Sequence, residues 1–215
     1  MIGMTLRQYY DERLDQLRAD VLRMGTFASD MVRSAVEATI NGDLALAEKV
    51  IQDDDEVDRL EHDILGRTVL TVMQESPVAS DLRTLVSFLS VIPEIEKIGD
   101  HAVKLSRRAT KLTGHFPAEM KLALSELGEE TRKMVGAALR LCDTFDGELA
   151  TEVIKGDKGI DGRYVAARDR LIGIIQENPH ETQHLIRTIE AFHALEHVAD
   201  NAVQIAARLK LHHEA

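Results

Sequence analysis

The segment Glu96-Lys-Ile-Gly-Asp-His-Ala-Val103 decides the fold of this chain, because it returns 100 positions later as Glu196-His-Val-Ala-Asp-Asn-Ala-Val203. Both copies place an aspartate four positions after a glutamate and end in Ala-Val. An earlier block repeats at an offset of 103, with residues 47–58 corresponding to 150–161. A fixed internal period is typical of a duplicated supersecondary unit. The sequence therefore predicts two related halves.

Turn and cap signals divide each half into three helices. Six long helices are expected, at about 5–40, 43–75, 77–112, 118–145, 148–177 and 179–213. Their ends are taken from Asn41-Gly42, Ser76-Pro77, Asp146-Gly147 and Asn178-Pro179, the last of which we interpret as an N-cap and first helical position. Short connections make consecutive helices antiparallel neighbours. The predicted fold is all-α, two tandem three-helix bundles at 1–113 and 114–215, with Gly114 and Pro117 at the boundary.

Composition narrows the class of protein. The net charge of -11 argues against nucleic-acid binding, which needs a basic surface. No apolar stretch is long enough for membrane insertion, and the N-terminus lacks the apolar core of a signal peptide. The single cysteine, Cys142, excludes an internal disulfide and is expected to be packed on a helix. These features predict a soluble cytoplasmic protein.

Each half also carries two pairs of acids spaced four residues apart. Like charges at this spacing on a helix repel each other by roughly 0.2–0.5 kcal/mol per pair. In both halves the two pairs are equidistant from the expected helical hairpin, so an antiparallel arrangement brings them level, across axes about 8–10 Å apart. An inward stripe through Leu82, Leu89 and Ile92 leads to Glu96, which is expected on the buried seam. The eight acids are Asp54, Asp58, Glu96, Asp100, Asp157, Asp161, Glu196 and Asp200.

Repetition of these pairs predicts that cations lie between them. Ligands that are all oxygens favour magnesium, manganese, calcium or iron, with room for more than one ion in each half. Two other interpretations remain open. The acids can form salt bridges, which Lys97 and Lys104 support in the first half, or a solvated acidic face. His193 and His197 have the spacing of a zinc-binding pair, but we expect them to be solvated.

The segment Pro77-Val-Ala-Ser-Asp-Leu-Arg83, together with the two Glu-x-x-x-Asp motifs, resembles the PhoU family over nearly the whole chain. The resemblance implies two three-helix bundles and multinuclear iron or zinc clusters held by the eight acids. Together with the oxygen ligands, it leaves iron, zinc, manganese or magnesium as the candidate metals. Glu61 is a weaker candidate, because its counterpart in the second half is Tyr164. The family commonly has arginine after the first acid, where this chain has Lys97 and His197.

A function also follows from the resemblance. PhoU-like proteins are cytoplasmic negative regulators of the phosphate-starvation response and of phosphate transport. The implied partners are the ATP-binding subunit of a phosphate ABC transporter, a phosphate-sensing histidine kinase and a second copy of the chain. Such a regulator is not an enzyme. One alternative is a metal-free helical adaptor with acidic docking faces, and the other is a carboxylate-bridged metalloenzyme. Such an enzyme takes its Glu-x-x-His motifs from two different helices. Here both pairs, Glu181 with His184 and Glu190 with His193, fall on one helix, which argues against the enzyme.

Overall fold

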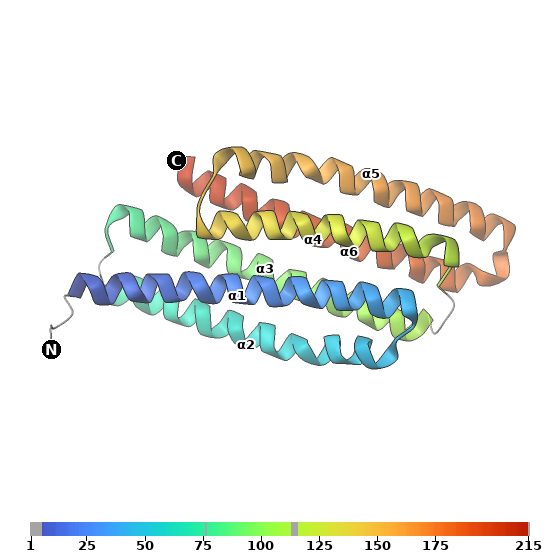
Figure 1. Ribbon diagram of the computed structural model, residues 1–215, viewed down its shortest axis with the longest axis horizontal. Coiled ribbons are helices and arrows are strands. Elements are labelled where there is room, and N and C mark those ends of the chain that lie inside the picture. The colour runs from blue at the N-terminus through green and yellow to red at the C-terminus, as the bar shows by residue number, and fades with distance from the viewer. Residues whose placement is uncertain (1–5, 76, 113–115, 215) are drawn as a thin grey trace.

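The chain is almost entirely helical over the residues that the computed structural model describes, which are 6–75, 77–112 and 116–214. Within these residues six long helices and two short 3-10 turns are formed (Figure 1). They are α1 (Leu6–Asn41), α2 (Leu44–Glu75), α3 (Ala79–Leu112), η1 (Ala118–Met120), α4 (Lys121–Asp143), α5 (Gly147–Glu177), η2 (Pro179–Glu181) and α6 (Thr182–Glu214). The predicted all-α fold of six long helices is confirmed. Among the described residues, no helix has the length and apolarity needed to cross a bilayer.

The helices run along the long axis of the molecule in two groups of three (Figure 1). α1, α2 and α3 pack on one another, as do α4, α5 and α6, and the groups meet where α3 packs on α6 and α1 on α4. α2 and α5 lie on opposite outer sides (Figure 1). One hydrophobic cluster takes in side chains from all six helices, including Met24, Phe88, Leu124 and Phe192. The predicted boundary at Gly114 falls outside the described residues.

Capping side chains explain where two of the helices begin. Gly42 has a φ of 67°, a left-handed conformation that glycine adopts without strain, and it ends α1 as expected. Asp43 then accepts a hydrogen bond from the Leu46 amide at 3.0 Å and starts α2. Asp146 was expected to close the fourth helix, but its carboxylate accepts hydrogen bonds from the Glu148 and Leu149 amides and caps α5.

Two predicted helix starts are wrong. α3 begins at Ala79, not at Pro77, and Ser76 lies outside the described residues. Asn178 does not cap the sixth helix, because its side-chain amide donates to the carbonyl of Ile174 at 3.4 Å, at the end of α5. Pro179 instead opens the 3-10 turn that precedes α6.

Two glycines let α1 and α4 approach closely. A Cβ on Gly25 would lie 2.2 Å from Cδ2 of Leu139, and one on Gly128 would lie 3.0 Å from Cγ2 of Val36. Any larger residue at Gly25 must displace a core leucine, so this glycine sets the separation of two helices from different halves.

The buried side of α3 is wider than the sequence predicts. α3 packs against α1, α2 and α6, so Phe88, Ile95 and Ile98 are buried along with the expected Ile92. The predicted stripe is wrong at Leu82, whose side chain is 39% exposed. Glu96 is half-buried at the margin of this surface and not on its seam.

Candidate functional site

The first group of acids forms at the interface between α2 and α3. Asp54, Asp58 and Glu61 come from α2, and Glu96 and Asp100 from α3. Asp54 and Gly99 are neighbours across this interface, since Oδ1 of Asp54 lies 3.6 Å from the place where a Cβ on Gly99 would be. The hairpin therefore brings the two pairs level, as their equal distances from the turn predict.

Crowding of negative charge changes the acidity of this group. Burial, followed by the charges of Asp58 and Asp100, raises the pKa of Asp54 to about 6. Burial and then Asp100, Glu61, Asp58 and Asp54 raise the pKa of Glu96 to about 7. A carboxyl group with a raised pKa is one whose ionised form lacks compensation. A cation placed between these side chains would supply that compensation.

Neighbouring basic side chains neutralise the first group only in part. Lys104 contacts Asp100 at 3.2 Å, so the salt-bridge interpretation holds for that acid. Lys97, which stands next to Glu96 in the sequence, instead pairs with Glu94 at 3.1 Å. The positive charge of Arg107 acts to lower the pKa of Asp54 but does not outweigh burial. Salt bridges among the described residues therefore leave Glu96 and most of Asp54's charge uncompensated.

The second group lies between α5 and α6 and contains two buried oxygens that lack hydrogen bonds among the described residues. Burial and the charges of Asp161 and Asp200 raise the pKa of Asp157. Burial and Asp200 likewise raise the pKa of Glu196, which His197 lowers in part. The two oxygens are Oδ1 of Asp157 and Oε2 of Glu196. Buried polar atoms in proteins are rarely left unpaired, so these oxygens suit a ligand.

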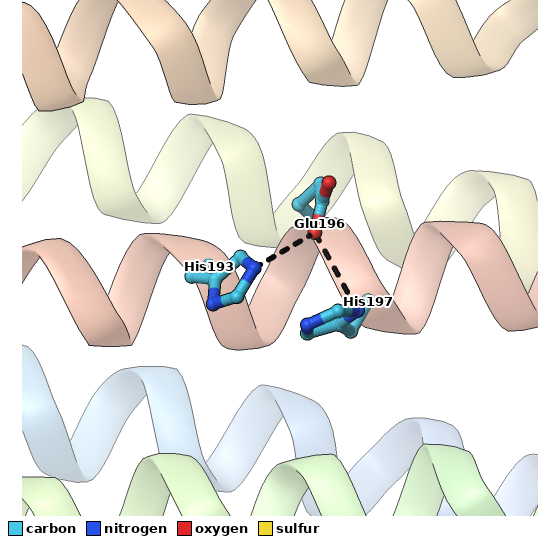
Figure 2. Close-up of side chains that lie close together, drawn as sticks. All are labelled: His193, Glu196 and His197. Carbon is cyan, nitrogen blue, oxygen red and sulfur yellow. Dashed lines mark ion pairs between the residues drawn. The ribbon is translucent and has the colours of Figure 1, made fainter.

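Two histidines surround Glu196 on α6. Oε2 of Glu196 lies 3.7 Å from Nε2 of His193 and 3.6 Å from Nδ1 of His197 (Figure 2). Nδ1 of His197 is also 3.5 Å from Oδ2 of Asp200. Donor atoms on a tetrahedral zinc ion lie about 3.4 Å apart, so this spacing is close to that of a metal-bound set. Within the described part of the chain, His193, Glu196 and His197 are the one group of three whose donor atoms lie within 4.8 Å of one another.

A line of stacked rings connects the two halves beside the second group. His101 of α3 stacks on His197 at 5.1 Å, His197 contacts His193 at 4.1 Å, and Tyr164 stacks on His193 at 5.4 Å, all measured between ring centroids. Burial, and then the charge of Lys104, lowers the pKa of His101 to about 4. Simple solvation describes neither His193 nor His197, because each ring lies between two others, although their side chains remain 46% and 42% exposed. The sequence offered one signal for His101, namely its place directly after Asp100 in the repeated motif.

The two halves therefore present different donor atoms. The five acids of the first group offer oxygen, which suits hard cations such as magnesium or manganese. The second half adds imidazole nitrogen, which suits zinc or iron. Tyr164 stands in the second half at the position that Glu61 has in the first, and its ring stacks on His193, a candidate nitrogen donor.

Cys142 plays no part in either group. It is 6% exposed, as expected for a packed residue, and burial raises the pKa of its thiol to about 12. A thiol with so high a pKa is a poor nucleophile.

Comparison with known proteins identifies relatives over almost the whole chain. The PhoU domain profile matches residues 21–109 and 124–209. A phosphate-specific transport system accessory protein PhoU homolog of Pseudomonas aeruginosa is 32% identical over 203 residues, which cover 94% of this chain and 84% of the relative. A protein of the same description from Clostridium acetobutylicum is 26% identical over 93% of this chain and 91% of its own length.

Solved structures share the arrangement of helices. The crystal structure of PhoU from Pseudomonas aeruginosa superposes with a TM-score of 0.89 at 30% identity, covering 95% of this chain and 99% of the other. The phosphate transport system regulatory protein PhoU of Streptococcus pneumoniae gives a TM-score of 0.86 at 23% identity, covering 95% and 96%, and shows the fold alone.

Proposed function

The chain belongs to the PhoU family, and from this membership we propose that it is a cytoplasmic accessory protein of a phosphate ABC transporter that negatively regulates the phosphate-starvation response. The observation that carries the proposal is the similarity to the transport accessory protein of Pseudomonas aeruginosa, which covers 94% of this chain and 84% of the relative. The regulator has no catalytic step of its own. Its proposed partners are the ATP-binding subunit of the transporter, a phosphate-sensing histidine kinase and a second copy of the chain.

The proposal includes metal binding at both groups of acids. Asp54, Asp58, Glu96 and Asp100 would hold one ion or cluster, with Glu61 at its edge. The raised pKa values of Asp54 and Glu96 support this assignment, because a metal compensates the charges that protein groups leave unpaired. When bound, the ion supplies positive charge and ties α2 to α3.

In the second half, the proposed ligands of a metal are again two acids from each helix. Asp157, Asp161, Glu196 and Asp200 fit the role, since Oδ1 of Asp157 and Oε2 of Glu196 are buried and have no hydrogen-bond partner among the described residues. His193 and His197 stand close enough to Glu196 to join them. Such an ion would tie α5 to α6, as its counterpart ties α2 to α3.

A metal-free adaptor is the competing proposal, and the ion pair between Lys104 and Asp100 favours it. In an adaptor the acids would recognise basic surfaces on partner proteins. Changing Asp54, Asp58, Glu96 and Asp100 to Asn, Asn, Gln and Asn separates the two. A metal site loses its ion, while an adaptor loses affinity for its partner with no change in metal content.

Elemental analysis of protein purified without chelator or metal-affinity resin tests the metal proposal. We expect bound metal in the wild type. Changing Glu96→Gln with Asp100→Asn should remove the share held by the first half, and Glu196→Gln with Asp200→Asn the share of the second. Equal loss from both halves in either variant contradicts two separate sites.

The regulatory proposal is tested in the source organism. Deletion of the gene should switch on phosphate-starvation genes in phosphate-rich medium, and purified protein should bind the ATP-binding subunit of the transporter. A deletion strain that keeps these genes repressed, with no detectable binding, would contradict the proposal. Light scattering of the purified protein tests the dimer.

A further inference from the structure

A pocket with an excess of positive charge lies between the C-terminal half of α3 and the N-terminal half of α6. Its volume is about 440 Å³. Five cationic side chains and one carboxylate line it, which leaves a formal charge of +4 on a chain whose net charge is -11. We name it the basic pocket; its lining residues are Lys104, Arg107, Arg108, Lys111, Gln183, Ile186, Arg187 and Glu190.

Three of the five cations have no carboxylate partner in the described part of the chain. Lys104 pairs with Asp100 at 3.2 Å, and Arg108 pairs with Glu190 at 3.0 Å. Among the residues that the structure describes, none offers a carboxylate oxygen within 4.0 Å of Arg107, Lys111 or Arg187. Arg107 still acts on Asp54 at longer range, so Lys111 and Arg187 are the two cations of the basic pocket whose charge no carboxylate among the described residues is shown to offset.

A second pocket shows how the same protein treats arginines elsewhere. The pocket that contains Arg163 and Arg170 has a volume of about 270 Å³. Arg163 pairs with Glu130 at 2.6 Å and Arg170 with Glu119 at 2.9 Å, two glutamates outside the lining of that pocket. Both arginines of that pocket are thus paired with glutamates, whereas in the basic pocket only Arg108 is.

Helix capping accounts for only part of this excess. Lys111 lies in the last turn of α3, where the helix dipole favours a cation, and Arg187 donates a hydrogen bond to the carbonyl of Lys111 at 3.3 Å. Arg187 itself belongs to the N-terminal half of α6, where the dipole gives no support to a positive charge. Arg107 caps no helix end, since it lies more than a turn before the end of α3.

We propose that the basic pocket binds a small anion with several phosphate groups, such as a triphosphate chain. Guanidinium groups match phosphate oxygens in geometry as well as charge, and a triphosphate carries about four negative charges at neutral pH, equal to the excess in the lining. The volume exceeds that of one phosphate and falls within the range of roughly 300–1,000 Å³ typical of ligand pockets. The described lining includes no aromatic side chain, so the phosphates and not a nucleobase are recognised.

Calorimetric titration with inorganic triphosphate tests the proposal. The full-length protein is first treated with chelator and dialysed, so that metal at the acids cannot bind the anion. Lys111→Gln and Arg187→Gln should each weaken binding roughly tenfold or more, the range for a hydrogen bond to a charged group. Lys133→Gln is the matched control, because Lys133 is an exposed lysine on α4 that does not line the pocket, and it should leave the dissociation constant unchanged. Circular dichroism establishes that each variant is folded.

Parallel titrations separate recognition of a phosphate chain from general attraction of anions and from binding to metal. Orthophosphate and citrate should bind more weakly than triphosphate, and ATP should match it. No heat of binding at millimolar triphosphate overturns the proposal. An equal loss of triphosphate affinity in Lys133→Gln also overturns it, because that result indicates general electrostatic attraction. Binding that appears only after metal is restored overturns it as well, because the anion then binds to the metal.

Discussion

Replacing Glu96 with glutamine is expected to make the metal-free protein more stable above neutral pH. Glutamine has nearly the same shape as glutamate but no charge. In the wild type, burial and the charges of Asp100, Glu61, Asp58 and Asp54 raise the pKa of Glu96 to about 7. Ionising Glu96 therefore costs more free energy in the folded chain than in the unfolded one.

The sign and size of the effect follow from this pKa. Because the folded pKa is higher than the ordinary value of 4.5, stability is fully present below about pH 4.5 and is lost as the pH rises through about 7. A rise of that size corresponds to a ceiling of roughly 3 kcal/mol, at 1.36 kcal/mol per pKa unit. Glu96 is only half-buried, so solvent screening reduces the expected gain in Glu96→Gln to about 1 kcal/mol at pH 8.

Thermal unfolding of chelator-treated protein, followed by circular dichroism, measures this gain. A gain of about 1 kcal/mol raises Tm by roughly 2–4 °C in a chain of this length. Below about pH 4 the difference should nearly vanish, since Glu96 is then protonated in both the folded and the unfolded state. Adding metal should reverse the order at pH 8, because the wild type gains binding free energy that the variant has lost.

A second glutamate on α2 provides the control. A hydrogen bond from Arg59 lowers the pKa of Glu56, so ionised Glu56 stabilises the fold. Glu56→Gln should not raise Tm at pH 8 with or without metal. If Glu96→Gln lowers Tm at pH 8 in chelator, or if both variants raise it equally, then crowding of the acids does not destabilise the metal-free protein and the argument fails.

Three further predictions test the packing and the second group of acids. Gly25→Ala should reduce the free energy of unfolding by roughly 1–3 kcal/mol in urea denaturation, because its Cβ overlaps a core leucine. Gly136→Ala is the control: a Cβ there meets nothing within 4 Å, so this change should raise the free energy of unfolding by roughly 0.5–1 kcal/mol. Similar values for the two variants would contradict the close approach of α1 and α4. Arg208→Met should lower the free energy of unfolding by roughly 2–4 kcal/mol in the same assay. The reason is that Glu94, which is 3% exposed, keeps only one lysine as partner among the described residues. The loss should be smaller in the double variant that also carries Glu94→Gln. His197→Ala should weaken zinc binding roughly tenfold or more in a competition titration with a zinc indicator, with magnesium binding unchanged; equal effects on both ions would exclude a nitrogen ligand.

The local order of residues encodes the helices. It also encodes which acids share a face of the same helix. Period and spacing are local properties, so a repeat of 100 residues predicts a duplicated unit and a separation of four residues places Glu96 beside Asp100. The level meeting of Asp54 with Asp100 follows in the same way, because position in an antiparallel hairpin depends only on distance from the turn. Helix ends are less well encoded, since Asn178 can close one helix as readily as it caps the next.

Which neighbours those acids have depends on how the helices pack. Lys97 turns to Glu94 and not to Glu96, because Glu94 is buried where α3 meets α6 and binds Lys97 and Arg208 together. His101 reaches His197 only because α3 of one half packs on α6 of the other. Such contacts depend on how two helical groups are rotated and translated against each other. The rotation is set by the fit of many side chains at once, which no local spacing in the sequence encodes.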